Sequence, residues 1–210
     1  DVIIIGAGVA GLYQLHCMRE LGLRVRSYEA GSGVGGTWYW NRYPGARFDS
    51  ESWSYGYSFS RELFEEWDWP EHFAAQPDTL RYLNYVADKF DLRRDINFNR
   101  RVKAALFNEK TNFWTVRTDT NESFEARFLI TAMGPLSAFT LPNIEGREAF
   151  EGPAYHTARW PHEKVDFSGK RVGIIGTGAC AIQTIQTIAK DVAHLTVFQR
   201  SPNWAAPLTN

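Results

Sequence analysis

Residues 2–11 read Val2-Ile3-Ile4-Ile5-Gly6-Ala7-Gly8-Val9-Ala10-Gly11, an apolar β-branched run that leads directly into a G-x-G-x-x-G motif. Apolar residues then recur at helical spacing as far as Leu21, and a second strand is predicted over residues 24–28. A strand, a glycine turn, a helix and a strand in this order are typical of a parallel sheet in an α/β domain.

Each glycine of this motif has a distinct physical task. Gly6 allows the tight turn, Gly8 lets the backbone approach a pyrophosphate, and Gly11 lets the helix pack closely on the strand. The helix N-terminus then binds the phosphates through backbone N–H groups. Glu29 lies 18 residues past Gly11, at the end of the second strand, where a carboxylate can accept both ribose hydroxyls. This context favours a dinucleotide site over the alternative of ordinary turn glycines.

A second unit with the same plan follows further along the chain. It has a strand over 172–175, the turn Gly176-Thr177-Gly178-Ala179-Cys180-Ala181, a helix to about Lys190 and a strand over 195–198. Glu29 follows the second strand of the first unit, whereas Gln199-Arg200-Ser201 follows the second strand of this one. A carboxylate would repel a 2′-phosphate, whereas a guanidinium and a hydroxyl would attract it. The alternative is that Arg200 is a solvated surface charge. Two sites of different preference indicate a flavoprotein with FAD at the first and NADPH at the second.

The predicted fold class is therefore α/β, with two Rossmann-like units that contain parallel sheets. Alternating residues over 96–108, 112–118 and 123–131 predict an antiparallel β-meander inserted in the first unit, and residues 128–132 are apolar enough to rejoin the parallel sheet. Helical spacing over 61–90 predicts two helices broken near Pro70 and Pro77. We expect an FAD-binding domain (N-terminal part) at 1–140, a linker at 141–169 and the start of an NADPH-binding domain at 170–210, with the second unit truncated.

Composition excludes several classes of protein. With 23 Lys+Arg against 24 Asp+Glu, the formal charge of −1 offers no handle for nucleic acid or anionic lipid. No stretch approaches the roughly 18 apolar residues of a membrane helix, and no basic-then-apolar leader is present, so we expect a cytoplasmic protein. Cys17 and Cys180 predict no disulfide framework, and the histidines have no metal-ligand spacing, so no metal is expected.

Two further segments carry a family resemblance. Residues 35–49, Gly35-Gly36-Thr37-Trp38-Tyr39-Trp40-Asn41-Arg42-Tyr43-Pro44-Gly45-Ala46-Arg47-Phe48-Asp49, fit G-G-x-W-x-x-x-x-[FY]-P-G-x-x-x-D. Residues 150–161, Phe150-Glu151-Gly152-Pro153-Ala154-Tyr155-His156-Thr157-Ala158-Arg159-Trp160-Pro161, fit F-x-G-x-x-x-H-x-x-x-W-P. Together with both glycine turns, these resemble the N-terminal portion of type I Baeyer–Villiger monooxygenases, in particular the cyclohexanone and cycloalkanone branch. The resemblance covers essentially the whole chain.

The resemblance implies an activity and a set of site residues. Such enzymes use NADPH to reduce FAD, form a C4a-peroxyflavin with O₂, and insert one oxygen atom beside a ketone carbonyl to give an ester or lactone. By position, the flavin side would be contacted by Gly36, Thr37, Trp38, Asp49 and Tyr55. The nicotinamide side would be contacted by Arg47, Phe48 and Asp49. NADP would be held by Thr177, Gly178, Ala179, Cys180, Ala181, Gln183, Arg200 and Ser201, and Val102 would meet the adenine side of FAD through its backbone.

Asp49 is the expected catalytic residue. In the family this acid pairs with an active-site Arg that stabilises developing negative charge, and Asp49 would position that Arg and raise its proton affinity. The alternative is that Asp49 caps a loop. The Arg is expected beyond Asn210, so we expect the chain to be incomplete and these 210 residues not to turn over ketone unaided. For His156, a linker role is expected rather than a catalytic one.

Two rival functions remain open. The first is a flavin monooxygenase that oxygenates nitrogen or sulfur, which would share both glycine turns. The second is a nucleotide-binding fragment without catalysis. A product assay on a cyclic ketone against a tertiary amine separates the first, and the intact mass and colour of the protein separate the second. The ketone accepted, the regiochemistry and the oligomeric state are not predicted.

Overall fold

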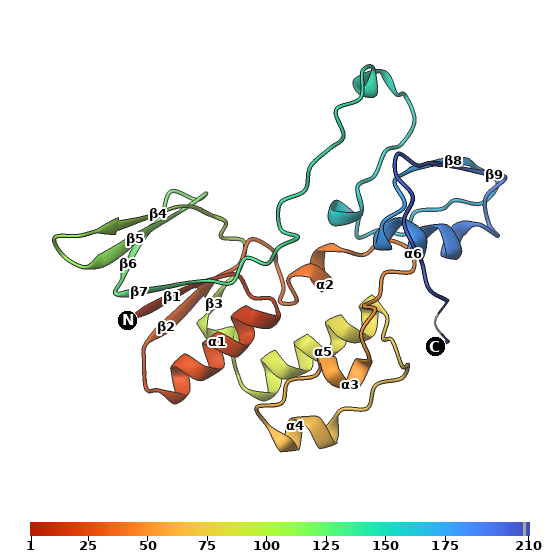
Figure 1. Ribbon diagram of the computed structural model, residues 1–210. Coiled ribbons are helices and arrows are strands. Elements are labelled where there is room, and N and C mark those ends of the chain that lie inside the picture. The colour runs from red at the N-terminus through yellow and green to blue at the C-terminus, as the bar shows by residue number, and fades with distance from the viewer. Residues whose placement is uncertain (208) are drawn as a thin grey trace. The chain divides into compact units, whose positions relative to one another are not determined.

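A computed structural model describes residues 1–207 and 209–210, and the chain divides into two compact units (Figure 1). Unit 1 contains Asp1–Tyr39 and Leu80–Phe139, and unit 2 contains Trp40–Thr79 and Thr140–Asn210. Each unit therefore contains one of the two glycine turns. The boundaries predicted at residues 140 and 169 separate cofactor-binding parts of the chain and not compact units, so they stay a prediction.

Unit 1 is built on a four-stranded parallel sheet in the order β3-β2-β1-β7. Its strands are β1 (Val2–Ile5), β2 (Val25–Tyr28), β3 (Ile96–Asn97) and β7 (Phe128–Thr131), and α1 (Val9–Glu20) connects β1 to β2. The apolar run becomes the centre of the sheet, since the residues of 2–4 are at most 3% exposed. The predicted α/β class is confirmed.

A three-stranded antiparallel meander is inserted in the sequence between β3 and β7 of this sheet, as predicted. It consists of β4 (Val102–Asn108), β5 (Phe113–Thr118) and β6 (Ser123–Ala126). Asn112 and Asn121 have positive φ at its turns, a conformation that Asn tolerates better than most residues. The prediction was wrong at residues 96–97, which pair with β2 in the parallel sheet instead of joining the meander. The 3-10 turn η1 (Arg93–Asp95) precedes them.

The helices between the glycine turns follow the predicted spacing with one difference. α4 (Arg61–Glu66) and α5 (Gln76–Lys89) are separate, and Leu83 and Val86 of α5 are at most 1% exposed. Pro77 does not break a helix, because it stands in the first turn of α5, where no intrahelical N–H is needed. α5 belongs in part to each unit.

Unit 2 contains the second strand–turn–helix–strand motif. β8 (Arg171–Ile175) pairs in parallel with β9 (His194–Phe198), and α6 (Ala179–Ile188) connects them, as predicted. The unit also holds α3 (Ser52–Tyr55) and the 3-10 turns η2 (Arg147–Ala149) and η3 (Thr157–Arg159), and α2 (Thr37–Trp40) lies at the unit boundary.

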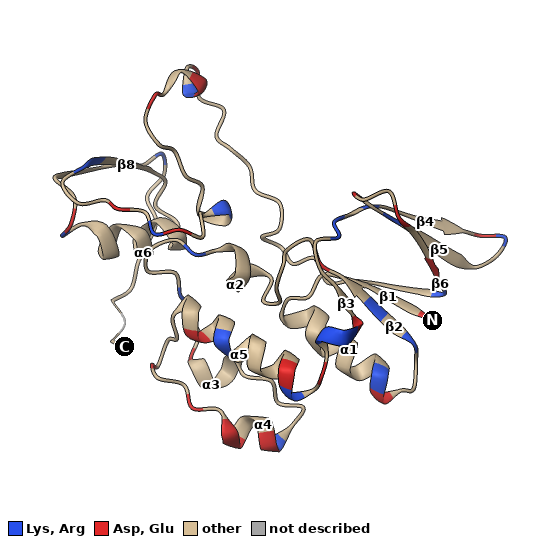
Figure 2. Cartoon of the chain, turned by 180° about the vertical axis from the view of Figure 1, so that it is seen from behind, with Lys and Arg blue, Asp and Glu red and all other residues tan. Residues whose placement is uncertain are grey.

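Acidic and basic residues are interspersed along the elements of both units (Figure 2), in keeping with the formal charge of −1. Among residues 1–207 and 209–210, no helix combines the length and apolar character needed to cross a membrane. Within the same part of the chain, no group of three or more His, Cys, Asp and Glu residues could hold a metal ion.

Candidate functional site

The first glycine turn packs so tightly against the backbone of unit 1 that two of its glycines have no room for a Cβ. Gly6 has φ +103°, and a Cβ there would lie 2.6 Å from the carbonyl oxygen of Ala132. A Cβ on Gly11 would lie 2.0 Å from the carbonyl oxygen of Gly6. Real carbon atoms do not approach oxygen so closely, so Gly6 lets the turn lie against the residue that follows β7, and Gly11 lets α1 lie against the end of β1.

Glu29 lies beside this turn and is 5% exposed. One carboxylate oxygen accepts a hydrogen bond from Ala7 N at 2.8 Å, and the other accepts from Gly31 N at 2.7 Å. Because a carboxylate has about four acceptor sites, both oxygens keep acceptor capacity for further donors. The carboxylate predicted to accept the ribose is therefore fixed in orientation beside the glycine turn.

The turn also contacts the first signature segment, a contact the sequence did not predict. Gly35 N donates to Ala7 O at 3.0 Å, and a Cβ on Gly36 would lie only 2.8 Å from Gly8 Cα. Conversely, a Cβ on Gly8 would lie 3.2 Å from Gly36 Cα. The paired glycines of the signature thus let it lie directly on the glycine turn. α2 begins at the next residue, Thr37, and Trp38 within it is 7% exposed.

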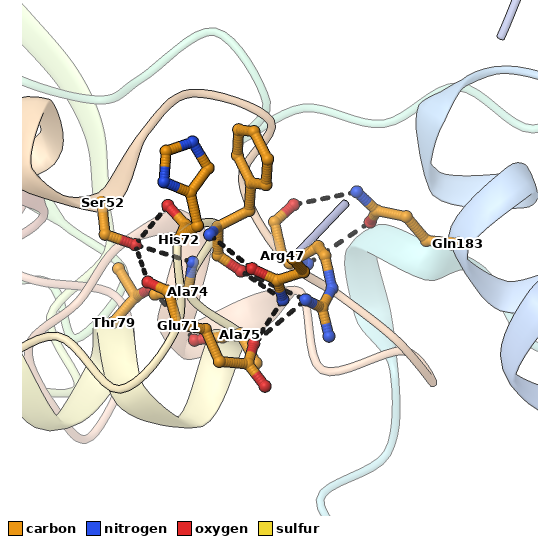
Figure 3. Close-up of polar contacts among 10 residues, drawn as sticks. Arg47, Ser52, Glu71, His72, Ala74, Ala75, Thr79 and Gln183 are labelled. Carbon is orange, nitrogen blue, oxygen red and sulfur yellow. Dashed lines mark hydrogen bonds and ion pairs between the residues drawn. The ribbon is translucent and has the colours of Figure 1, made fainter. Parts of the chain in front are cut away.

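In unit 2 the rest of that signature forms a loop over residues 41–49. Arg47 makes an isolated antiparallel bridge with Ala75, and Gln76 N donates to Ala46 O at 2.8 Å. The Arg47 guanidinium donates to Glu71 Oε2 at 3.0 Å and to the carbonyl oxygen of Phe73 at 3.1 Å (Figure 3). Residues 71–76 therefore hold both the backbone at Ala46–Arg47 and the side chain of Arg47.

Ser52 fixes the segment that holds Arg47. Its hydroxyl lies 2.7 Å from the carbonyl oxygen of Glu71 and 2.9 Å from that of His72, and it accepts from Ala74 N at 2.9 Å (Figure 3). Ser52 is 2% exposed and Ala74 is fully buried. Sequence reasoning missed both Ser52 and Glu71, because neither stands at a motif position and their contacts exist only after folding.

The end of the loop brings aromatic and acidic side chains together. Phe48 is 6% exposed and stacks on Tyr55 with ring centroids 4.3 Å apart and planes 8° from parallel. Asp49 follows with an exposed side chain. Burial raises the pKa of Tyr43 far above its ordinary value, and the neighbouring Cys180 thiol and Asp49 carboxylate raise it further. Tyr43 is therefore a neutral hydroxyl donor.

The second glycine turn differs from the first in one respect that bears on ligands. Gly178 has φ −72° and ψ 178°, which any residue can adopt, and no heavy atom lies within 4 Å of a Cβ built there. Neither the backbone nor the packing of the chain therefore requires glycine at this position. A glycine that leaves open space in front of a helix N-terminus fits the approach of a phosphate group.

The third motif position also differs between the two units. Ala181 occupies it in unit 2, whereas Gly11 in unit 1 has no room for a Cβ. Thr177 accepts hydrogen bonds from Gln199 Nε2 at 3.3 Å on its hydroxyl and from Asn203 Nδ2 at 2.9 Å on its carbonyl. The sequence did not predict this role for Asn203. Arg200 and Ser201 follow β9 with exposed side chains.

The remaining predicted residues lie outside these turns. Val102 begins β4 and packs against the buried cluster of unit 1 that contains Tyr28 and Val116. His156 Nδ1 accepts from Ala158 N at 3.1 Å and so caps η3, which fits a structural role in the second signature. The Arg159 guanidinium lies 4.8 Å from the Trp40 ring centroid, so a cation–π contact joins the two signatures within unit 2.

Residues 1–207 match the family described as Flavin-binding monooxygenase-like. The chain belongs to this family. An acetone monooxygenase (methyl acetate-forming) of Gordonia sp. is 53% identical over the whole chain, a phenazine N-monooxygenase of Lysobacter antibioticus 49% over 99% of it, and a cyclohexanone 1,2-monooxygenase of Acinetobacter sp. 46% over the whole chain. The chain spans 38–39% of the length of these flavin-binding monooxygenase-like relatives.

Solved structures of the family have the same fold. An oxidized steroid monooxygenase bound to NADP has a TM-score of 0.94 at 57% identity, and OTEMO in complex with FAD and NADP has a TM-score of 0.95 at 50% identity. Each comparison covers 99% of this chain and 40% of the other. The resemblance to Baeyer–Villiger monooxygenases predicted from residues 35–49 and 150–161 is confirmed, since these relatives include enzymes named for ketones.

Proposed function

We propose that unit 1 binds FAD. The phosphates would meet the N-terminus of α1 at Gly6, Gly8 and Gly11, and the ribose would bond to Glu29. In support, Glu29 is buried and already oriented by Ala7 N, and its oxygens keep acceptor capacity. Thr37, Trp38 and Gly36 would contact the flavin side, and Val102 the adenine side through its backbone.

Unit 2 then binds NADP, and NADPH is preferred over NADH. The open space at Gly178 would receive the pyrophosphate, together with Thr177, Ala179, Cys180 and Ala181, and the family resemblance adds Gln183 to this set. Arg200 and Ser201 would hold the 2′-phosphate, because a guanidinium and a hydroxyl both donate to phosphate oxygens. The exposure of both side chains at the end of β9 is compatible with this role. On this assignment, residues 1–140 are the FAD-binding part, 141–169 the linker and 170–210 the start of the NADPH-binding part.

The activity proposed for the whole protein is Baeyer–Villiger oxidation of a ketone to an ester or lactone. When bound, NADPH supplies a hydride and FAD accepts it and activates O₂. Arg47 and Phe48 would meet the nicotinamide side, and Tyr55 the flavin side. Asp49, which is exposed and directly follows Phe48 in the chain, would hold and orient a cationic group that stabilises negative charge on the reacting atoms.

The observation that carries this proposal is the pair of phosphate-type turns in a chain with 46–53% identity to an acetone and a cyclohexanone monooxygenase. Nitrogen oxygenation is a second candidate, because a phenazine N-monooxygenase is 49% identical over nearly the same residues. Similarity over this part of the chain therefore does not separate the two reactions. The cytoplasmic location expected from the sequence stays a prediction.

The deciding experiment uses the protein in its full natural length. We expect flavin absorbance bands in the purified protein, bleaching of those bands by NADPH without O₂, and ester or lactone formation from a cyclic ketone with O₂. A tertiary amine and a phenazine serve as competing substrates. An N-oxide as the sole product would select the second candidate, and a colourless protein that does not take up FAD would refute both.

A further inference from the structure

Gln183, in the second turn of α6, directs its side chain at the signature loop (Figure 3). Its Oε1 accepts from the Tyr43 hydroxyl at 2.8 Å and from Arg47 N at 3.4 Å, and its Nε2 donates to Arg47 O at 3.0 Å. A primary carboxamide has the donor and acceptor of a peptide group. Gln183 therefore pairs with the backbone of Arg47 as a neighbouring strand would.

The bridge between Arg47 and Ala75 explains why the backbone N–H and C=O of Arg47 can bond to Gln183. On that side Gln76 N bonds to Ala46 O, so the bridge is of the type in which the flanking residues form the hydrogen bonds. The N–H and C=O of Arg47 itself then point to the other side, toward Gln183. The backbone of residues 46–47 therefore has two partners. Residues 75–76 pair with it on one side as a strand does, and the Gln183 side chain bonds to Arg47 on the other side.

Packing reinforces this pairing. Gly45 has φ +78°, and a Cβ there would lie 2.6 Å from Gln183 O and 2.2 Å from Thr187 Oγ1. The loop backbone thus lies against α6 as closely as glycine allows. Thr187 Oγ1 itself donates to Gln183 O at 2.8 Å, which keeps the contacting surface of the helix fixed.

We propose that Gln183 is a positioning residue whose carboxamide fixes the loop of residues 43–49 against α6 and thereby places Arg47, Phe48 and Asp49 for the reaction. The inference rests on the proposed function, in which these three side chains meet the cofactors. It differs from the role that family resemblance implies for Gln183, a contact to NADP, because both polar atoms of the side chain already have partners in the loop.

The first test is independent of activity and measures hydrogen–deuterium exchange in the full-length protein without nucleotide. Gln183→Met keeps the length of the side chain and removes its hydrogen bonds, so exchange in the peptide spanning residues 43–49 should be faster by about tenfold. Gln186→Met is the matched control, because Gln186 is exposed on the same helix, and it should leave this peptide unchanged. Unchanged exchange in Gln183→Met would overturn the proposal.

A second variant guards against a general folding defect. Gln183→Glu keeps the size of the side chain and the acceptor for Tyr43, but its carboxylate cannot donate to Arg47 O. It should give the same acceleration in residues 43–49 with a smaller change in the rest of unit 2. Equal acceleration throughout unit 2 in both variants would mean that Gln183 only stabilises the fold, and the proposal would fail.

Transient kinetics separate positioning from nucleotide binding. For anaerobic reduction of the flavin by NADPH, we expect Gln183→Met to lower the limiting rate about tenfold and to change the NADPH Kd less than about threefold. A raised Kd with an unchanged limiting rate and unchanged loop exchange would assign Gln183 to the nucleotide and overturn the proposal. Absence of flavin reduction in the wild type would refute the proposed function instead, and the exchange experiment would then decide the role of Gln183.

Discussion

Two Gly→Ala substitutions should have opposite effects on stability, because the packing of the chain requires glycine at one position and leaves open space at the other, which we propose a ligand fills. In Gly178→Ala the new Cβ enters open space at φ −72°. Such a change stabilises by about 0.4–1 kcal/mol through the unfolded chain, or about 1–4 °C in Tm for a chain of this size. In Gly11→Ala the Cβ would lie 2.0 Å from Gly6 O, a backbone atom, so a loss of about 1–3 kcal/mol or more is expected.

The assay is thermal unfolding with and without NADP⁺. At a concentration about 100-fold above Kd, the nucleotide should stabilise the wild type by about 2.7 kcal/mol. If the Cβ in Gly178→Ala occupies the place of a phosphate and weakens binding about tenfold, the same concentration should add only about 1.4 kcal/mol. The reasoning is refuted if Gly178→Ala binds NADP⁺ like the wild type, or if it loses as much stability as Gly11→Ala.

Three further outcomes are expected. Ser52→Ala should lower the free energy of unfolding by about 1–3 kcal/mol, because it leaves the buried Ala74 N–H without its acceptor. Ser54 is exposed, so Ser54→Ala should change the free energy of unfolding by no more than about 0.5 kcal/mol, and chemical denaturation of both variants measures the difference. Above pH 10 the Tyr43 phenol loses its proton only in the unfolded state, since its folded pKa is raised. Stability should therefore fall by up to about 1.4 kcal/mol per pH unit, and an equally steep alkaline fall in Tyr43→Phe would contradict this. Arg200→Ala should raise the KM for NADPH at least about tenfold and that for NADH less than about threefold, and equal changes in steady-state assays would show that Arg200 does not bind a 2′-phosphate.

Most of the fold could be predicted because its signals are local. The apolar run of residues 2–5, the glycine turns and the alternating strands of the meander each extend over a few neighbouring residues, and the structure contains all of them. The two-residue strand β3 was assigned to the meander, because so short a segment has no periodicity of its own. Only its pairing with β2 shows that Ile96 belongs to the parallel sheet.

The candidate site was predictable to a lesser extent. The motifs predicted Arg47, Asp49 and Gln183 as site residues, and in unit 2 Arg47 and Gln183 are hydrogen-bonded to each other. The partners that hold Arg47 were not predicted. Glu71 and Ser52 belong to no motif, and the stretch Asp49-Ser50-Glu51-Ser52 is typical of any turn or helix start.

By itself the sequence determined two strand–turn–helix units, the strand-end residues that differ between them, and the family, because backbone requirements and hydrophobic periodicity are encoded within short segments. The tertiary structure alone decided which glycines the chain needs for its own packing and which have open space in front of them. It also decided that a side chain of α6 pairs with the backbone of Arg47. That contact joins residues 136 positions apart, and no local pattern can specify a partner so distant in sequence.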